Sequence, residues 1–233
     1  MNIALFGYGK MGKMIDALAT AKGFNIVAKI GPDTTEIDYN TIDVAIDFST
    51  PDAAFNNISR CFEHNIPVVS GTTGWLKRYD EIIALCTEKK GAFIYASNFS
   101  LGVNLFFQLN EQLAKMMQQL DSYAVAMEEI HHTQKLDAPS GTAITLAEGI
   151  AANSAYTNWT MESPAKNEVP ITSKRIGTVP GTHSITYNST VDSIEITHTA
   201  HNREGFALGA ITAAHWLVGK TGVFSMKDVL GLP

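Results

Sequence analysis

The glycine-rich loop near the N-terminus constrains the fold of this chain more than any other feature. It reads G-Y-G-K-M-G from Gly7 to Gly12, between an apolar run at 2–6 and a segment of helical periodicity at 10–22. In a strand–turn–helix unit the first glycine permits a tight turn, the second admits a pyrophosphate and the third lets the helix pack on the strand. Free N–H groups at the start of the helix favour phosphates as well. A glycine turn without a ligand explains this position less well, so we expect cofactor contacts at Gly7, Gly9, Lys10, Met11 and Gly12.

Strands and helices alternate over the first hundred residues. Short apolar runs that predict strands occupy 2–6, 25–30, 43–48, 66–70 and 92–95. Helical periodicity occupies 10–22 and 75–90, and Pro51 begins a further helix at its favoured first-turn position. This alternation implies an α/β fold with a Rossmann-like, doubly wound parallel sheet.

The pattern changes after residue 100. Segments 101–120, 140–153 and 205–219 predict helices, and 123–130 predicts a strand. Over 171–199 β-branched residues alternate, as in neighbouring antiparallel strands. The stretch 153–167 is expected to be a loose connection.

These two patterns predict two domains. The dinucleotide-binding domain is expected over residues 1–99 and to be completed by 205–233. An α+β substrate domain with a mixed sheet is expected to be inserted between these parts, over 100–204.

The end of the second predicted strand bears on cofactor preference, because a ribose-binding acid is expected there, about twenty residues after the glycine loop. The end reads Lys29-Ile30-Gly31-Pro32-Asp33. Asp33 is a candidate partner for a ribose 2′-hydroxyl, whereas Lys29 suits a 2′-phosphate, and either could instead be a solvated loop charge. NADH and NADPH therefore both stay candidates.

Two later loops follow the carboxyl ends of predicted strands, where the nicotinamide half of a dinucleotide would lie. The first reads Gly71-Thr72-Thr73-Gly74, and the second reads Ala96-Ser97-Asn98-Phe99-Ser100. Their hydroxyls, amide and glycines suit hydrogen bonds to a carboxamide and a ribose. Ordinary turns would have the same spacing, so both interpretations stay open here.

Proton-transfer groups gather between Glu128 and Thr142, which reads E-E-I-H-H-T-Q-K-L-D-A-P-S-G-T. Histidine is the natural general acid near neutral pH, so His131 is a candidate acid. Lys135 could hold a carboxylate or help to deliver a proton. Neighbouring histidines on a strand face opposite ways, so His132 shares the same cleft only if the backbone bends there.

The next residues, Ser140, Gly141 and Thr142, resemble a helix entry. Ser140 or an earlier aspartate would cap the helix, and the turn would offer N–H groups and a hydroxyl to an anion. A plain capped helix explains the same letters, and the nearby Lys135 favours the anion site. His198 and His201 have no cysteine or carboxylate set around them that would complete a metal site, so we expect no metal.

Composition excludes several classes of protein. The net charge of −6 disfavours nucleic acid as the main partner, although an acidic protein can hold a local cationic pocket. Cys61 and Cys86 form no disulfide framework, which favours a reducing, cytoplasmic location. The N-terminus has no charged n-region, and no apolar run reaches membrane-spanning length, so we expect neither a signal peptide nor a membrane partner.

Further motifs occur in one order along the whole chain. They are D-F-S-T-P at 47–51, G-T-T-G at 71–74, N-F-S at 98–100, H-H-T-Q-K-L-D-A-P-S-G-T at 131–142, R-I-G-T-V-P-G-T-H at 175–183, I-T-H at 196–198 and R-E-G-F-A-L-G-A at 203–210. With the glycine loop they resemble the dihydrodipicolinate reductase family, also called 4-hydroxy-tetrahydrodipicolinate reductases. The histidine motif is far more specific than the glycine loop.

The resemblance implies hydride transfer from NADH or NADPH to C4 of a cyclic imine dicarboxylate in the diaminopimelate–lysine pathway. It implies catalytic roles for His131 and Lys135, and a homotetramer built on the sheet of the second domain. The implied substrate contacts are His132, Ser140, Gly141 and Thr142. The implied nicotinamide-side contacts are Gly71, Thr72, Thr73, Ala96, Ser97, Asn98 and Phe99. Gly31-Pro32 replaces the family's usual acid and displaces Asp33, which leaves cofactor preference open.

Two alternatives are compatible with part of the pattern. Another Rossmann oxidoreductase, such as an amino-acid dehydrogenase, would explain the glycine loop but not the order of histidines, lysine and anion turn. A non-catalytic NAD(P)-binding sensor would bind the cofactor without a dicarboxylate site. In the reductase, we expect domain closure to exclude water from the reaction.

Overall fold

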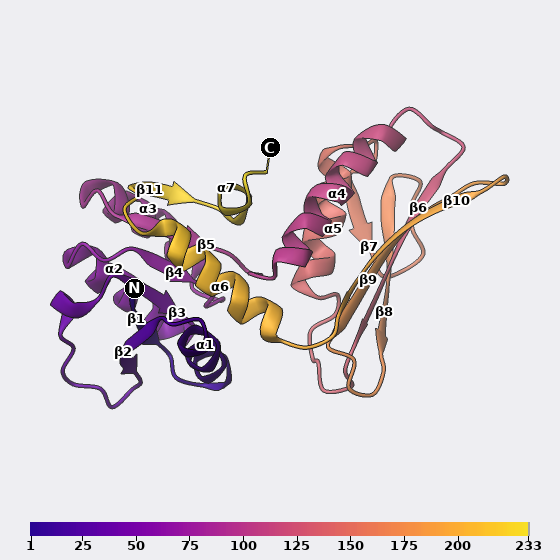
Figure 1. The fold of residues 1–233 in the computed structure, drawn as a ribbon. Coiled ribbons are helices and arrows are strands. Elements are labelled where there is room, and N and C mark those ends of the chain that lie inside the picture. The colour runs from indigo at the N-terminus through magenta and orange to yellow at the C-terminus, as the bar shows by residue number, and fades with distance from the viewer. Residues whose placement is uncertain (233) are drawn as a thin grey trace. The chain divides into compact units, whose positions relative to one another are not determined.

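The computed structural model describes residues 1–232, and the chain divides into two compact units (Figure 1). Unit 1 consists of Met1–Leu101 together with the described residues from Glu204 onward, and unit 2 is Gly102–Arg203. Among the residues described, none of the helices combines the length and apolar character needed to cross a membrane.

Unit 1 is built on a six-stranded sheet in which every neighbouring pair is parallel. The strand order is β11-β5-β4-β3-β1-β2. The chain leaves β1 for β2 on one side and returns to β3 on the other, which creates a switch point at their carboxyl ends, the usual ligand position in such sheets. The strands are β1 (Asn2–Phe6), β2 (Asn25–Ile30), β3 (Val44–Asp47), β4 (Val68–Ser70), β5 (Ala92–Tyr95) and β11 (Gly222–Phe224).

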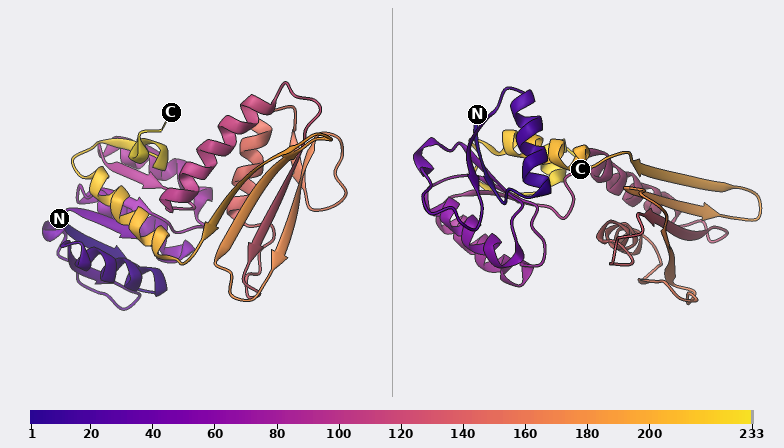
Figure 2. Two further views of the ribbon diagram at one scale, coloured as in Figure 1. Left: turned by 45° about the vertical axis from the view of Figure 1, so that its right-hand side comes forward. Right: turned by 90° about the horizontal axis from the view of Figure 1, so that it is seen from below.

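Helices cover both faces of this sheet (Figures 1 and 2). One apolar cluster joins α1, α6 and α7 to the sheet, and a second joins α2 and α3 to its other face. Burial on both faces explains why the strands read as continuous apolar runs. The helices are α1 (Lys10–Ala21), α2 (Pro51–Glu63), α3 (Tyr79–Glu88), α6 (Glu204–Leu217) and α7 (Met226–Leu230), with the 3-10 turns η1 (Tyr39–Thr41) and η2 (Leu76–Arg78).

Both cysteines lie in the second of these clusters. Cys61 on α2 and Cys86 on α3 are free thiols whose side chains are buried against the sheet. Burial raises the pKa of both thiols. They therefore pack as small apolar residues.

Unit 2 contains a mixed five-stranded sheet with the order β10-β9-β6-β8-β7. The β10–β9 and β9–β6 pairs are antiparallel, whereas β6–β8 and β8–β7 are parallel. Helices α4 and α5 lie on one face of this sheet (Figure 2) and share one core with it. The elements are α4 (Leu101–Met117), β6 (Ala124–His131), α5 (Gly141–Ala152), β7 (Asn158–Thr160), β8 (Glu168–Arg175), β9 (Gly181–Asn188) and β10 (Ser193–Ala200).

The structure corrects two sequence-based expectations. The stretch 153–167 is not only a loose connection, because its centre forms β7, which pairs with β8. The helix expected from Trp75 begins at Tyr79, after the turn η2. The reason is local: the indole Nε1 of Trp75 donates to the carbonyl of Thr72 at 2.7 Å and holds that residue in the preceding loop.

Candidate active site

Three loops of unit 1 that are predicted to contact a cofactor meet around Phe48, which follows β3. A Cβ at Gly7, where φ is +92°, would lie 2.1 Å from the carbonyl oxygen of Phe48. A Cβ at Gly71 would lie 2.3 Å from its ring, and Phe99 packs edge-on against that ring with centroids 5.9 Å apart. Side chains larger than hydrogen are thus excluded at Gly7 and Gly71, and the backbones of these loops come together at the switch point.

The glycine loop has the shape required by a pyrophosphate. A Cβ at Gly12 would lie 2.2 Å from the carbonyl oxygen of Gly7, so this glycine allows close helix–strand packing. At Gly9, by contrast, none of the described residues has a heavy atom within 4 Å of a Cβ position. Gly9 is also the N-cap of α1, whose first turn carries Lys10 and Lys13. Open space, free N–H groups and positive charge fit a dinucleotide phosphate.

The end of β2 presents one neutralised cation and one exposed carboxylate. The Nζ atom of Lys29 lies 2.6 Å from Oδ2 of Asp16 and 5.0 Å from the centre of the Tyr8 ring. The ammonium group lowers the pKa of Asp16, and Asp16 raises that of Lys29. Asp33 is exposed in the turn that follows β2. The ion pair with Asp16 therefore holds Lys29 beside the glycine loop and neutralises its charge.

Thr72 fixes the loop after β4, one of the loops predicted to contact the cofactor. Its hydroxyl donates to the fully buried carboxylate of Asp47 at 2.7 Å and accepts from the backbone N–H of Ser49 at 2.9 Å. Ser70 donates to the same carboxylate at 2.9 Å. The side chain of Thr72 thus ties β3 to the loop after β4, while its neighbour Thr73 is exposed.

The loop after β5 is anchored in a similar way. Phe99 is buried in the core of unit 1, and the Oδ1 atom of Asn98 accepts from the backbone N–H of Ser100 at 2.9 Å. Ser97 is exposed, and Ala96 is half-buried. The side chains at 98 and 99 therefore shape this loop from inside the fold.

In unit 2, the buried face of β6 changes from apolar to ionisable along its length. Alternate residues face α5, and they run from Val125 and Met127 to Glu129 and His131. His131 is the last residue of the strand and is buried, whereas His132 lies just beyond the strand and is partly exposed. The strand's own period therefore separates the two histidines.

Glu129 is the centre of a hydrogen-bond network, although it is 0% exposed. Its Oε2 atom accepts from the backbone N–H of Ser140 at 3.0 Å. Its Oε1 atom accepts from Ser173 at 2.8 Å and from the guanidinium of Arg175 at 3.2 Å. Burial opposes ionisation most strongly, but these hydrogen bonds outweigh it and lower the pKa of Glu129. The carboxylate is therefore charged.

Two imidazoles flank this carboxylate. Oε2 of Glu129 lies 3.4 Å from Nδ1 of His131 and 3.7 Å from Nε2 of His183. The rings of the two histidines meet edge-on with centroids 5.0 Å apart. Burial lowers the pKa of His183 to about 4, and its Nε2 atom lies 3.1 Å from Oγ of Ser140. His183 is thus a neutral member of the cluster.

Burial is also the main cause that lowers the pKa of His131. The cations Lys135 and Arg175 lower it further, while Glu129 and, to a lesser degree, Asp137 raise it. Lys135 lies in the loop after β6, with its Nζ atom 2.8 and 2.7 Å from the two carboxylate oxygens of Asp137. This ion pair lowers the pKa of Asp137.

The predicted anion turn begins at a capped helix. Ser140 is the N-cap of α5, and its Oγ atom accepts from the backbone N–H of Ala143 at 3.2 Å. Among the described residues, no heavy atom lies within 4 Å of a Cβ position at Gly141. Thr142 follows in the first turn and is partly exposed. The hydrogen bond from Ser140 to Glu129 links this turn directly to the strand that carries His131.

The family of the chain follows from comparison with known proteins. A family model described as the N-terminus of dihydrodipicolinate reductase matches residues 1–99, and one described as its C-terminus matches residues 102–230. The chain belongs to the dihydrodipicolinate reductase family. Membership confirms the predicted family and the class of NAD(P)H-dependent oxidoreductase, with NADH or NADPH as cofactor.

Relatives in this dihydrodipicolinate reductase family align over the full chain. The 4-hydroxy-tetrahydrodipicolinate reductase of Christiangramia forsetii is 58% identical over 233 residues, which cover 99% of this chain and 98% of the relative. That of Archaeoglobus fulgidus is 36% identical over 261 residues, which cover 99% and 100%. The dipicolinate-bound dihydrodipicolinate reductase from Paenisporosarcina sp. TG-14 has the same fold, with a TM-score of 0.80 at 22% identity and 98% coverage of both chains. The predicted α/β fold class is confirmed.

The trio of Glu129, His131 and His183 contains donor types that also bind metals, with one such atom from each residue within 4.8 Å of the others. We assign it to a hydrogen-bond network instead. Both oxygens of Glu129 already accept hydrogen bonds, and one of these comes from the Arg175 guanidinium. A fixed cation at this distance opposes the binding of a second one.

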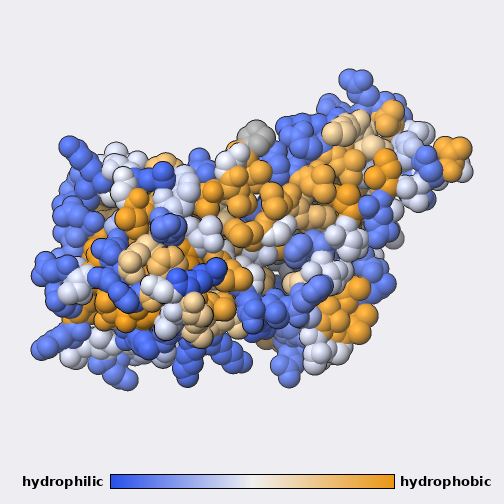
Figure 3. All heavy atoms as spheres, viewed as in Figure 1, coloured by the Kyte–Doolittle hydropathy of each residue, from blue (hydrophilic) through white to orange (hydrophobic). Residues whose placement is uncertain are grey.

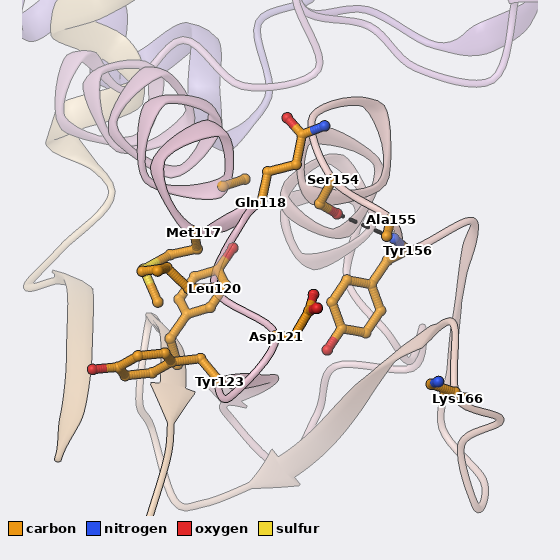
Figure 4. Close-up of a pocket in the computed structure, with 11 residues that line it drawn as sticks. Met117, Gln118, Leu120, Asp121, Tyr123, Ser154, Ala155, Tyr156 and Lys166 are labelled. Carbon is orange, nitrogen blue, oxygen red and sulfur yellow. Dashed lines mark hydrogen bonds between the residues drawn. The ribbon is translucent and has the colours of Figure 1, made fainter. Parts of the chain in front are cut away.

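A pocket of about 390 Å³ opens elsewhere in unit 2 of this reductase (Figure 4). It lies between the ends of α4 and α5 and is lined by Tyr123, Tyr156, Asp121 and Lys166. Tyr123 precedes β6, whereas His131 ends it, so about 26 Å of strand separates the two places. This pocket is distinct from the histidine cluster.

Sequence reasoning missed several residues of the candidate site. Glu129 could have been found from strand parity, because it shares a face with His131 two residues later. Arg175 and His183 begin and end a quoted motif, but their role depends on strand pairing. Glu129 pairs with His183 on β9, and His131 pairs with Arg175 on β8.

Proposed function

We propose that this chain reduces 4-hydroxy-tetrahydrodipicolinate to tetrahydrodipicolinate, with the 4-hydroxyl group leaving as water, in diaminopimelate and lysine biosynthesis. The observation that carries the proposal is the group in unit 2 formed by a buried histidine, a neighbouring lysine and the start of α5. Such a group can hold a small dicarboxylate and give it a proton. The names of the relatives support the choice of substrate.

In the proposed mechanism, His131 donates the proton that balances hydride addition. NADH or NADPH supplies the hydride when it is bound to unit 1. Lys135 holds one substrate carboxylate, and Ser140, Gly141 and Thr142 offer N–H groups and a hydroxyl, with His132 beside them. In the free protein, burial and the positive charges of Lys135 and Arg175 lower the pKa of His131. A bound dicarboxylate would offset these two positive charges. Substrate binding thereby favours the protonated imidazole.

We assign the two units different parts of this task. Residues 1–99 with 205–233 hold the dinucleotide, through the loops around Gly7–Gly12, Gly71–Thr73 and Ala96–Phe99, with Asp33 at the ribose. Residues 100–204 hold the dicarboxylate and connect copies of the chain. Two free, buried cysteines are in keeping with a cytoplasmic location.

A coupled assay tests the reaction. Dihydrodipicolinate synthase, pyruvate and aspartate semialdehyde generate the substrate, and the loss of absorbance of NADH or NADPH reports turnover. We expect oxidation that depends on every component of the mixture. Cofactor binding without turnover would favour a sensor, and turnover with an amino acid would favour an amino-acid dehydrogenase.

Replacing Lys135 with alanine should raise KM for the substrate and lower kcat, because the variant loses both a carboxylate contact and a charge beside His131. We expect each parameter to change by about tenfold or more, the value of a charge-assisted hydrogen bond. Steady-state kinetics with saturating cofactor measure both. Lys174→Ala is the matched control, since Lys174 pairs with Glu128 at the surface. A change confined to cofactor affinity would contradict the role of Lys135.

We also propose a homotetramer that associates through unit 2. The sheet face opposite α4 and α5 carries short or polar side chains, including Ala126, Ser184 and Thr186. On α4, Leu105, Leu109 and Met116 are large apolar residues about half-exposed or more, and Figure 3 shows apolar surface gathered along this helix. Exposed apolar surface of the kind found on α4 favours protein contacts. Light scattering should give four times the 25.3 kDa chain mass, and a monomer mass would refute the assembly.

A further inference from the structure

We propose that Glu129 is the positioning residue for His131: its carboxylate holds the Nδ1 edge of the imidazole, balances the imidazolium charge and ties the Ser140 turn to the same strand. The inference rests on the proposed role of His131 as the proton donor. Glu129 itself is fully buried behind His131 and acts through that residue.

The geometry assigns different tasks to the two edges of the His131 ring. Nδ1 is buried, lies 3.4 Å from Oε2 of Glu129 and has no aligned hydrogen-bond partner within residues 1–232. Nε2 lies at the opposite edge, beside Gly181, where a Cβ would come within 3.1 Å of it. A small rotation of the ring would align Nδ1–H with the carboxylate. Nε2 would then carry the proton that is given to the substrate, and Nδ1–H would stay with Glu129.

The carboxylate is itself fixed in place by three groups from two other segments. Ser173 and Arg175 on β8 hold Oε1, and the backbone N–H of Ser140 at the start of α5 holds Oε2. Several hydrogen bonds of this kind fix both the position and the charge of a carboxylate. Any displacement of Glu129 would therefore move the anion turn as well as the imidazole.

The charges around His131 make Glu129 the main group that favours its protonation. Lys135 from the following loop and Arg175 from β8 are cations that disfavour the imidazolium. Asp137 opposes them less than Glu129 does, because Asp137 lies in an exposed ion pair with Lys135. On β9, the burial of His183 keeps its ring neutral, so it supplies no compensating charge.

The test is the pH profile of kcat/KM for Glu129→Gln, which keeps the side-chain shape and one acceptor oxygen but removes the charge. The rate of a reaction that needs protonated His131 falls as pH rises through the pKa of this residue. Loss of a counter-charge within 4 Å should lower the midpoint of that fall by about one pH unit or more. Above both midpoints, the rate should then be lower by roughly the same power of ten as the distance between the two midpoints on the pH scale.

The neighbouring variant Glu128→Gln is the matched control. Glu128 is adjacent on β6 but faces the other side of the sheet, where it pairs with Lys174. Its profile should coincide with that of the unmodified protein. A lower rate for Glu129→Gln at every pH with an unmoved midpoint would overturn the proposal, because a merely structural role predicts that result.

A measurement on the unmodified protein covers the case in which Glu129→Gln does not fold. The ¹⁵N chemical shifts of the His131 ring report which nitrogen carries the proton in the neutral form. We expect Nδ1–H, and an Nε2–H tautomer would refute the proposal. Failure of the reaction itself is recognised separately, because the unmodified protein would then show no turnover or His131→Gln would retain full activity.

Discussion

Replacing His131 with glutamine should lower kcat by about two to four orders of magnitude, the usual contribution of a general acid. The affinity for NADH or NADPH should stay nearly unchanged, because the loops expected to bind the cofactor belong to unit 1 and His131 belongs to unit 2. Glutamine keeps a polar group of similar reach but cannot carry the proton. Steady-state kinetics and cofactor titration by fluorescence measure the two quantities.

The pH dependence sharpens the expected result for His131. Burial and two nearby cations lower the pKa of His131 in the free protein. We therefore expect kcat/KM to fall as pH rises, with a midpoint below the ordinary histidine pKa of about 6.5. This fall of kcat/KM with pH should be absent in His131→Gln. His201→Gln is a suitable control, since His201 is exposed beyond β10. Unaltered turnover in His131→Gln would remove this residue from the mechanism.

Replacing Gly209 with alanine should destabilise the protein by about 3 kcal/mol or more, although glycine to alanine inside a helix otherwise gains about 1 kcal/mol. A Cβ at 209 would lie 1.7 Å from the carbonyl oxygen of Phe99, so α6 and the loop after β5 would have to separate. Because that loop is one of the proposed cofactor contacts, the affinity for NADH or NADPH should fall as well. Urea unfolding gives the stability, and fluorescence titration gives the affinity.

Gly205 on the same helix provides the matched control for Gly209. A Cβ at 205 would lie 3.4 Å from Oγ of Ser100, an ordinary contact with a short side chain. Gly205→Ala should therefore leave the urea midpoint unchanged or raise it slightly. Equal stabilities for the two variants would show that α6 does not pack against the Phe99 carbonyl in solution.

The fold was most predictable where local signals agreed with one another. The strands 2–6, 25–30 and 92–95 have the predicted limits, because each is a short apolar run that ends at a turn or loop. The three-residue strands β7 and β11 were missed. Strands this short exist through their partners β8 and β5, and no local pattern encodes such pairing.

The candidate site shows the same division between local and long-range information. His131, Lys135 and Ser140 could be proposed from one continuous segment, since their residue types and spacing are informative by themselves. His183 and Arg175 join them only through the register of β9 and β8 against β6. For Thr72, the residue type alone suggested a hydrogen bond to a ribose. In the structure its hydroxyl instead donates to the buried carboxylate of Asp47.

The two cysteines under the first sheet have a practical consequence. Cys61 and Cys86 are the chain's only thiols, both belong to unit 1, and burial keeps them protonated and out of reach of reagents. A thiol reagent can modify them only when α2 or α3 opens away from the sheet. The labelling rate under native conditions thus reports the opening of this one unit, whatever happens around His131. Two side chains without a role in the proposed chemistry can therefore serve as built-in reporters of local unfolding in unit 1.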